Sequence, residues 1–309
     1  MATVHANGID LNVVRMNVAP TAEDRQSAPP IVMIHGIVID NLSSLYYTLA
    51  NHIAGGHEVI LYDQRGHGRS DRPPTNYRVE DSVADLTGVL DAIGIQEPVI
   101  LIGNSYGGAV SLGFAMAHPD RVAGLGLIEA HFGVEGWGDR MASMLHRTSA
   151  VAREGLALEP VFRVTRKVPD EAIPALRSVG LDDFEVEFIK HWIENSPMRK
   201  VLKMGHNAQA LLDGTTIIAD LQAEQPVPEA DLAAITCPTL ICYGEHSDII
   251  DRAHDLARLL PNAELSIIMG SDHSVLMSGP EELRARILPW LARIRAEVVV
   301  PAGGAAVGF

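Results

Sequence analysis

The sequence is poor in cysteine and in basic residues, and each shortage excludes a class of protein. Two cysteines in 309 residues are too few for a disulfide scaffold. Cys237 and Cys242 also have no neighbouring Cys or His pair that would complete a zinc site, so we expect buried thiols. The 24 Lys and Arg against 39 Asp and Glu give a net charge of −15, which argues against a nucleic-acid partner, because neutralising phosphates needs clustered cations.

Apolar runs long enough to cross a membrane are also missing. Nowhere do as many as about 18 apolar residues follow one another, and a helix needs roughly 20 of them to span a bilayer. The first residues, Met1–Gly8, carry neither the basic segment nor the apolar segment of a secretory signal. We therefore expect a cytoplasmic protein with no membrane partner, and the sequence leaves its oligomeric state open.

The sequence does have a regular alternation of short apolar runs and segments with helical spacing. Runs of β-branched and aliphatic residues are typical of strands buried on both faces of a parallel sheet. Their alternation with helices predicts a doubly wound α/β domain, and the first run, after the Asn7-Gly8 turn, predicts an antiparallel strand. The expected strands are Ile9–Met16, Ile31–Ile34, Val59–Tyr62, Val99–Ile102, Leu125–Ile128, Leu240–Tyr243 and Leu265–Met269, and the expected helices are Val79–Ile93, Ala109–Ala117 and Arg252–Leu260.

One long segment interrupts this alternation. Residues 134–225 contain no convincing strand pattern, and their apolar residues recur at helical spacing. We therefore expect an α/β core formed by residues 1–133 and 226–297, with residues 134–225 inserted as a helical cap. The glycine- and alanine-rich residues 298–309 are expected to form a flexible tail.

Aromatic side chains in and near this insertion are candidates for a substrate pocket. Phe184, Phe188 and Trp192 recur at every fourth position, and such a stripe either packs on the core or roofs a pocket. Ligands bind at the carboxyl edge of open α/β sheets, so apolar residues near predicted strand ends are further candidates. The candidate pocket residues are Tyr46, Tyr47, Tyr106, His131, Phe132, Trp137, Phe188 and Trp192.

The strongest local motif is Gly103-Asn104-Ser105-Tyr106-Gly107-Gly108, which follows the predicted strand Val99–Ile102 and precedes a helix rich in small residues. This is G-x-S-x-G in the strand–turn–helix setting of a nucleophile elbow. The serine there occupies a strained backbone position, and the flanking glycines avoid collisions with neighbouring elements. The N-terminus of the following helix directs N–H groups at developing negative charge. Ser105 is therefore the predicted nucleophile.

Several motifs in one order make nearly the whole chain resemble an α/β-hydrolase-fold enzyme. They are Val32-Met33-Ile34-His35-Gly36, the segment Asp63–Ser70, the Ser105 elbow, Tyr243-Gly244-Glu245-His246-Ser247-Asp248 and Gly270-Ser271-Asp272-His273. The resemblance implies a mostly parallel sheet with a helical cap inserted after the sixth strand. It also places the oxyanion-hole donors at the backbone N–H groups of Ile37 and Tyr106. It implies a structural role for the Asp63–Asp71 segment, and structural hydrogen bonds are expected of His35 and His67.

A serine hydroxyl needs a base to remove its proton, and thirteen histidines compete for that role. His273 follows the last predicted strand, and the resemblance implies the chain order Ser…Asp…His. The acid that orients the base is predicted to be Asp248, just beyond the preceding strand. Glu129, which follows the strand before that one, is the reserve acid.

The expected reaction is hydrolysis of a carboxylic ester or thioester of a small, largely apolar molecule through an acyl-enzyme, without cofactor or metal. Haloalkane dehalogenases and epoxide hydrolases carry an aspartate where this chain has Ser105. Asn104 resembles the elbow of the meta-cleavage-product hydrolases, which cleave C–C bonds of vinylogous diketones. However, Ile37-Val38-Ile39-Asp40 and Ser274 replace their usual Gly-Pro-Gly run and tryptophan. Perhydrolase, haloperoxidase or acyltransferase activity, and a non-catalytic binding protein of the same fold, remain alternatives.

Overall fold

The computed structural model describes residues 1–38, 40–54, 56–157, 170, 173–178, 186 and 198–299. The chain divides into two compact units. The first comprises Met1–Asp71, Val79–Gly133 and the chain from Pro226 on, and the second comprises Arg72–Arg78 and Val134–Gln225. The second unit therefore contains the range predicted for the helical cap, together with one short segment that the sequence did not assign to it.

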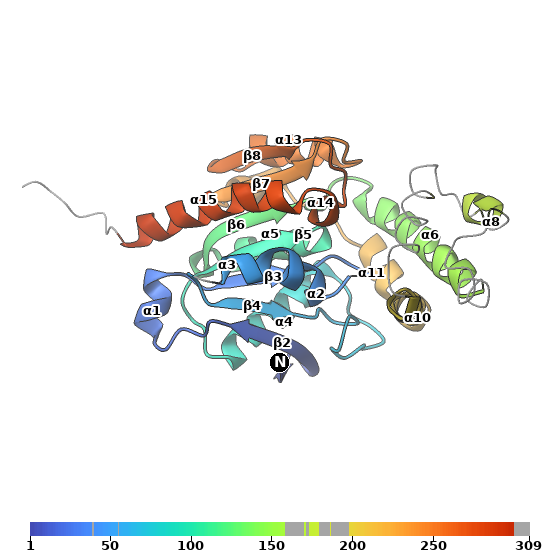
Figure 1. Cartoon of the computed structure of the whole chain (residues 1–309), viewed down its shortest axis with the longest axis horizontal. Helices are drawn as coiled ribbons and strands as arrows, with labels where there is room; N and C mark the ends of the chain where they lie inside the picture. Colours follow the sequence, from blue (N-terminus) through green and yellow to red (C-terminus); the bar gives the residue numbers. More distant parts are fainter. Residues whose placement is uncertain are drawn as a thin grey trace, which may run out of the picture. The chain divides into compact units, whose positions relative to one another are not determined.

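The first unit is built on an eight-stranded sheet with the order β1-β2-β4-β3-β5-β6-β7-β8 (Figure 1). β1 pairs with β2 and β2 with β4 in antiparallel orientation, and the remaining neighbours are parallel. The predicted α/β fold is thus confirmed. The strands are β1 (Ala2–Ala6), β2 (Ile9–Met16), β3 (Ile31–Ile34), β4 (Val59–Tyr62), β5 (Val99–Asn104), β6 (Val122–Ile128), β7 (Thr239–Gly244) and β8 (Ala263–Ile268).

The helices of the first unit lie between these strands along the chain or follow the last of them. In the longest of those predicted, α4, the apolar residues Val83, Leu86 and Val89 are buried, as their spacing predicted. Glu80 and Asp81 in its first turn complement the positive end of the helix dipole. The helical elements are α1 (Ala22–Ser27), α2 (Leu42–Leu45), the π-helix η1 (Tyr46–Ala50), α3 (Asn51–Ile53), α4 (Val79–Ala92), α5 (Tyr106–Ala117), the 3₁₀ turn η2 (Pro119–Arg121), α12 (Glu229–Ala233), α13 (Ile250–Leu259), α14 (Val275–Ser278) and α15 (Pro280–Val299).

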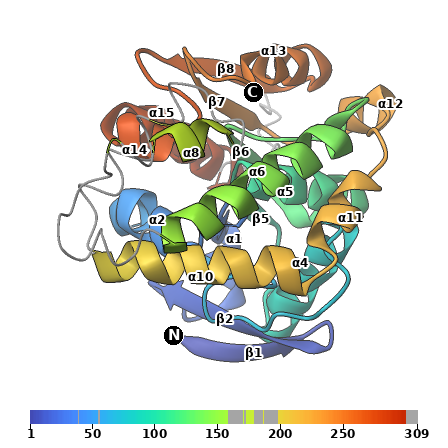
Figure 2. The same cartoon turned by 90° about the vertical axis from the view of Figure 1, so that its right-hand side faces the viewer.

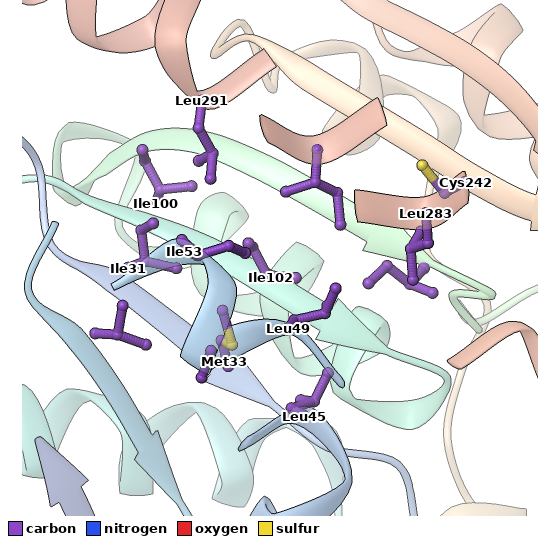
Figure 3. Packing of buried hydrophobic residues seen from close by; sticks show 14 of the residues in the cluster. Ile31, Met33, Leu45, Leu49, Ile53, Ile100, Ile102, Cys242, Leu283 and Leu291 are labelled. Carbon is purple, nitrogen blue, oxygen red and sulfur yellow. The ribbon is translucent and has the colours of Figure 1, made fainter. Parts of the chain in front are cut away.

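A hydrophobic core lies between one face of the sheet and the helices α2, η1, α3, α14 and α15. Ile100 and Ile102 of β5 are part of it (Figure 3). In β6, which follows β5 in the sheet, this face carries Gly124 and Gly126, where a Cβ would lie 3.3 Å and 3.6 Å from the Trp290 ring of α15. The missing side chains make room for Trp290, which is 1% exposed. Close packing of this kind fixes α15 against the centre of the sheet.

The two cysteines are free thiols of the first unit. Cys242 of β7 lies in the core (Figure 3), where burial raises the pKa of its thiol to about 12. Burial also raises the pKa of the half-buried Cys237 to about 11. Both thiols are therefore protonated at neutral pH and unsuited to act as nucleophiles.

The second unit is helical where it is described. Its helices are α6 (Trp137–Ala157), α8 (Ile173–Ser178), α10 (Met198–Gly214) and α11 (Ile217–Gln222). α6 lies beside α10 and α11 (Figure 2), and a Cβ at Gly138 would lie only 2.6 Å from the carbonyl oxygen of Gln222. The Arg72–Arg78 segment joins the unit because Tyr77 N–H donates to Asp220 Oδ2 over 2.9 Å. Phe184, Phe188 and Trp192 lie outside the described residues.

Among the described residues, no helix combines the length and the apolar composition that a membrane span requires.

Asp63, in the segment expected to be structural, joins three parts of the first unit. It follows β4 and is 2% exposed. Its carboxylate accepts hydrogen bonds from Leu42 N–H over 2.9 Å, from Asn12 Nδ2 over 2.8 Å and from Arg69 N–H over 2.9 Å. Three donors thus satisfy the buried charge, and two of them are backbone N–H groups.

We predict that Asp63→Asn destabilises the protein. The amide replaces one acceptor oxygen by an NH₂ group, and leaving a buried donor without a partner costs roughly 1–3 kcal/mol. Urea unfolding measures the free energy of unfolding, and Asp120→Asn, at an exposed aspartate of η2, is the matched control. Equal unfolding midpoints for Asp63→Asn and Asp120→Asn would contradict the structural role of Asp63.

Candidate active site

Ser105 occupies a strained turn between β5 and α5. Its φ of 54° and ψ of −119° lie in a sparsely populated region for a residue with a side chain, at a cost on the order of 1–3 kcal/mol. Ser105 N–H donates to the carbonyl of Ile128 over 2.9 Å, and its own carbonyl accepts from Gly108 N–H over 2.9 Å and His131 N–H over 3.1 Å. Three backbone hydrogen bonds therefore hold the turn and present the hydroxyl at the carboxyl edge of the sheet.

The glycines of the motif make this turn possible. A Cβ at Gly103 would lie 2.3 Å from the carbonyl oxygen of Gly107. A Cβ at Gly107 would lie 2.1 Å from the carbonyl oxygen of Ile34, at the end of β3. Real Cβ atoms do not approach backbone this closely, so both positions require glycine. The close approach brings the start of α5 against the strand ends on which the site is built.

His273, in the loop after β8, lies beside the serine. Its Nε2 is 3.2 Å from Ser105 Oγ, and its Nδ1 is 3.0 Å from Glu129 Oε2. A carboxylate accepts only, so Nδ1 carries the proton on this side and Nε2 is left to accept from the serine hydroxyl. The three side chains thus form a continuous chain of contacts from Ser105 through His273 to Glu129.

Glu129 is fixed more firmly than the other members of this chain. Its side chain is fully buried, and its φ of 49° turns it away from the path of β6. Its carboxylate accepts from Gly244 N–H and from Ser247 Oγ, both over 2.6 Å, in addition to His273. A buried carboxylate is tolerated only with such donors. Sequence reasoning missed Ser247, although it lies directly before Asp248 in the motif.

Asp248 does not hold the place that the sequence predicted for it. Its Oδ1 is 4.0 Å from His273 Nδ1, beyond hydrogen-bond distance, and its side chain is 82% exposed. β6 and β7 are neighbours in the sheet, so both acids come close to His273. Glu129 directly follows its strand and its positive φ turns it inward, which gives the reserve acid the contact.

The carboxylates around His273 change its basicity. Desolvation of the ring by itself would lower the pKa of His273. The hydrogen bond and the charge of Glu129, with the charges of Asp248 and Asp272, outweigh this effect and raise the pKa above its ordinary value of 6.5. The imidazolium that forms when the base takes a proton is therefore stabilised.

The two predicted oxyanion donors belong to segments next to the serine. Tyr106 is the first residue of α5, so its N–H belongs to the positive end of the helix dipole. Ile37 lies in the loop after β3, next to Gly36, where a Cβ would be 3.4 Å from Ser105 Cβ. The side chain of Tyr106 is buried, and its hydroxyl lies 3.4 Å from Ser82 Oγ. The phenol therefore points toward α4 of the first unit.

The structure places the candidate pocket residues in different elements. The ring of His131 lies 5.4 Å from that of His273, next to the serine and its base. Tyr46 packs against the hydrophobic core and stacks edge-on with Tyr47, 5.1 Å between centroids. Phe132 is buried in the first unit, at 3% exposure. Trp137 begins α6 in the second unit, and Phe188 and Trp192 lie outside the described residues.

Within the described part of the chain, no group of three or more His, Cys, Asp or Glu side chains is arranged to hold a metal ion. The chemistry that the site can perform with its own groups is proton transfer and nucleophilic attack by Ser105.

Comparison with known proteins agrees with this architecture. A family model described as the alpha/beta hydrolase fold matches residues 29–280. Over 124 residues, or 40% of its length, the chain is 32% identical to epoxide hydrolase B of Mycobacterium tuberculosis, and it spans only 34% of that relative. It is 25% identical over 277 residues to 2-(acetamidomethylene)succinate hydrolase of Mesorhizobium japonicum, covering 88% of this chain and 90% of the relative.

A solved structure shows the same fold. MGS-M2, an alpha/beta hydrolase enzyme from a Medee basin deep-sea metagenome library, superposes with a TM-score of 0.73 at 18% identity, covering 94% of this chain and 97% of that one. The family match spans most of the sheet and includes the elbow, Glu129 and His273. This chain therefore belongs to the alpha/beta hydrolase fold family.

Proposed function

We propose that this hydrolase cleaves a carboxylic ester or thioester of a small, largely apolar molecule through an acyl-enzyme on Ser105. One observation carries the proposal: Ser105, His273 and Glu129 form an unbroken chain of contacts, 3.2 Å and 3.0 Å long. This arrangement of nucleophile, base and orienting acid is recognised by geometry and roles, whatever the order in the sequence.

In the first half of the reaction, His273 Nε2 takes the proton of Ser105 Oγ while Oγ bonds to the substrate carbonyl carbon. The carbonyl oxygen becomes an oxyanion, for which the backbone N–H groups of Ile37 and Tyr106 are the proposed donors. Each such donor is worth roughly 3–4 kcal/mol where it has been measured. The intermediate collapses when the alcohol or thiol leaves with the proton from His273, and the acyl group remains on Ser105.

In the second half, water replaces the leaving group. His273 Nε2 takes a proton from water as its oxygen bonds to the acyl carbon, and then returns the proton to Ser105 Oγ as the acid is released. Throughout, Glu129 accepts the Nδ1–H of His273 and stabilises the imidazolium. The proton that His273 takes up in each half is released again in the same half, and water supplies the atoms that replace the leaving group. The proposed cycle therefore needs no cofactor.

The relatives support a hydrolytic role at a coarser level. The Mesorhizobium japonicum relative that spans nearly the whole chain is a hydrolase by name. The Mycobacterium tuberculosis relative is an epoxide hydrolase by name. The family resemblance implies an aspartate at the elbow for that chemistry, and this chain has Ser105 there. We therefore propose acyl transfer to water, and p-nitrophenyl esters of rising acyl length, an acyl-thioester and a ring-fission diketone would distinguish the ester, thioester and C–C hydrolase reactions.

Ser105→Ala is expected to abolish covalent labelling by a fluorophosphonate probe and to lower turnover of p-nitrophenyl esters by roughly 10⁶-fold, because no other group replaces the nucleophile. Intact-protein mass spectrometry and ester turnover measure the two effects. Ser278→Ala, at an exposed serine of α14, is the control that keeps both. A wild-type protein that folds but neither reacts with the probe nor turns over any activated ester would overturn the enzyme proposal.

Glu129→Gln is expected to lower kcat by about 10³- to 10⁴-fold. If the amide oxygen keeps the Gly244 N–H, its NH₂ faces His273 Nδ1 and forces the ring proton onto Nε2, which then cannot accept from Ser105. Asp248→Asn neutralises an exposed carboxylate that makes no hydrogen bond to His273, and it is expected to lower kcat far less. Steady-state kinetics of the two variants show which residue orients His273. A larger loss of kcat in Asp248→Asn than in Glu129→Gln would assign that role to Asp248.

The acid limb of the pH profile should reflect the raised pKa of His273. Only the neutral ring can act as base, so kcat/KM is expected to fall as the pH drops through a pKa above 6.5. Asp248 contributes to the raised pKa, so Asp248→Asn should move the limb to lower pH, while the exposed Asp120→Asn leaves it in place. A limb that stays in place or moves to higher pH in Asp248→Asn would show that its charge does not act on the base.

A further inference from the structure

The loop that carries Ile37 N–H, a proposed oxyanion donor, contains a strained residue, as the Ser105 turn does. Val38 has a φ of 70°, in the left-handed region that a β-branched side chain rarely adopts. It is 6% exposed, so its backbone is also removed from water. Strain of this kind persists only where neighbouring contacts enforce it.

The contact that enforces it comes from His67, far away in the sequence. Val38 N–H donates to His67 Nε2 over 2.7 Å, and His67 Nδ1 lies 2.7 Å from the carbonyl oxygen of Arg65. Because Nε2 accepts, the proton must sit on Nδ1, which donates to that carbonyl. His67 is 5% exposed and is therefore a neutral ring of defined tautomer joining two loops.

The Gly36 side of Ile37 has hydrogen bonds of its own. Gly36 N–H donates to Asp40 Oδ2 over 2.8 Å. The carbonyl oxygen of Gly36 lies 2.6 Å from His35 Nδ1, whose Nε2 accepts from Gln64 N–H over 3.0 Å. A trans peptide is planar, so fixing the Gly36 carbonyl points the N–H of Ile37 in the opposite direction. The peptide after Ile37 then depends on the hydrogen bond to His67.

We propose that His67 is a positioning residue for the oxyanion hole: it holds the Ile37–Val38 peptide and thereby keeps Ile37 N–H aimed at the reacting carbonyl. The proposal rests on the proposed serine hydrolase function. Without His67, Val38 N–H is buried without an acceptor, and rotation about the Ile37 and Val38 dihedrals relieves both that loss and the strained φ. Ile37 N–H belongs to the Gly36–Ile37 peptide, so a shift on the Val38 side displaces this donor by pivoting that peptide about its contact with His35. A displacement of about 1 Å can cost on the order of 10²-fold in rate.

Two substitutions of His67 separate its two hydrogen bonds. In His67→Gln, the side-chain oxygen reaches the position of Nε2 and accepts from Val38 N–H. In His67→Asn, the shorter amide reaches the position of Nδ1 and donates to the Arg65 carbonyl, leaving Val38 without an acceptor. We expect His67→Asn to lower kcat for an activated ester by about 10²-fold with little change in KM, and His67→Gln to restore most of the loss.

A matched control removes a similar histidine elsewhere. His57 is also buried, and its Nδ1 bonds the carbonyl of Pro29 before β3, at the opposite edge of the sheet from the site. His57→Asn is expected to keep kcat even where it lowers the melting temperature. If His67→Asn and His57→Asn lose kcat equally, or if His67→Gln is as slow as His67→Asn, the positioning role of His67 is refuted.

Amide hydrogen exchange followed by NMR tests the anchor without relying on turnover. The Val38 amide should be protected in the wild type and in His67→Gln, and should exchange faster in His67→Asn. Equal protection in all three proteins overturns the proposal. If the wild type cleaves no ester and Ser105 resists the fluorophosphonate probe, the proposed function fails, and Val38 exchange alone decides whether His67 holds the loop.

Discussion

The buried carboxylate of Glu129 is the constraint on which the site depends. A charge removed from water must be satisfied by hydrogen bonds, and Glu129 meets this need with Gly244 N–H, Ser247 Oγ and His273 Nδ1–H. These donors come from the last residue of β7 and from the loops after β7 and β8, so the carboxylate joins three consecutive strand ends of the sheet. The hydrogen bond that helps to satisfy the buried carboxylate therefore also orients the His273 ring.

The backbone around the site is strained at the positions that matter most. Ser105, Glu129 and Val38 all have positive φ, although none is glycine. The N–H group of each donates to a residue of another element: Ser105 to the Ile128 carbonyl of β6, Glu129 to the Cys242 carbonyl of β7, and Val38 to the His67 ring. In the proposed mechanism, such a framework fixes nucleophile, acid and oxyanion loop before substrate arrives, which is what electrostatic stabilisation of a transition state requires.

The sequence predicted the fold well because buried parallel strands leave continuous apolar runs. Ile9–Met16, Ile31–Ile34 and Val59–Tyr62 begin and end where predicted. It missed β1, most of which is exposed at the sheet edge, so that no apolar run marks it. It did not show which of Glu129 and Asp248 contacts His273, because both follow adjacent strands and only the local φ and burial separate them. The contact of His67 with Val38 depends on two loops meeting, which no local pattern encodes.

We propose that Glu129, and not Asp248, accepts the hydrogen bond from His273 Nδ1–H and keeps the ring in line with Ser105. Proton NMR of the wild type and of two variants tests it directly, since a ring N–H bonded to a buried carboxylate gives a resonance far downfield of the backbone amides. We expect this His273 Nδ1–H resonance to persist in Asp248→Asn and to disappear in Glu129→Gln. A resonance that survives Glu129→Gln and is lost in Asp248→Asn would contradict it.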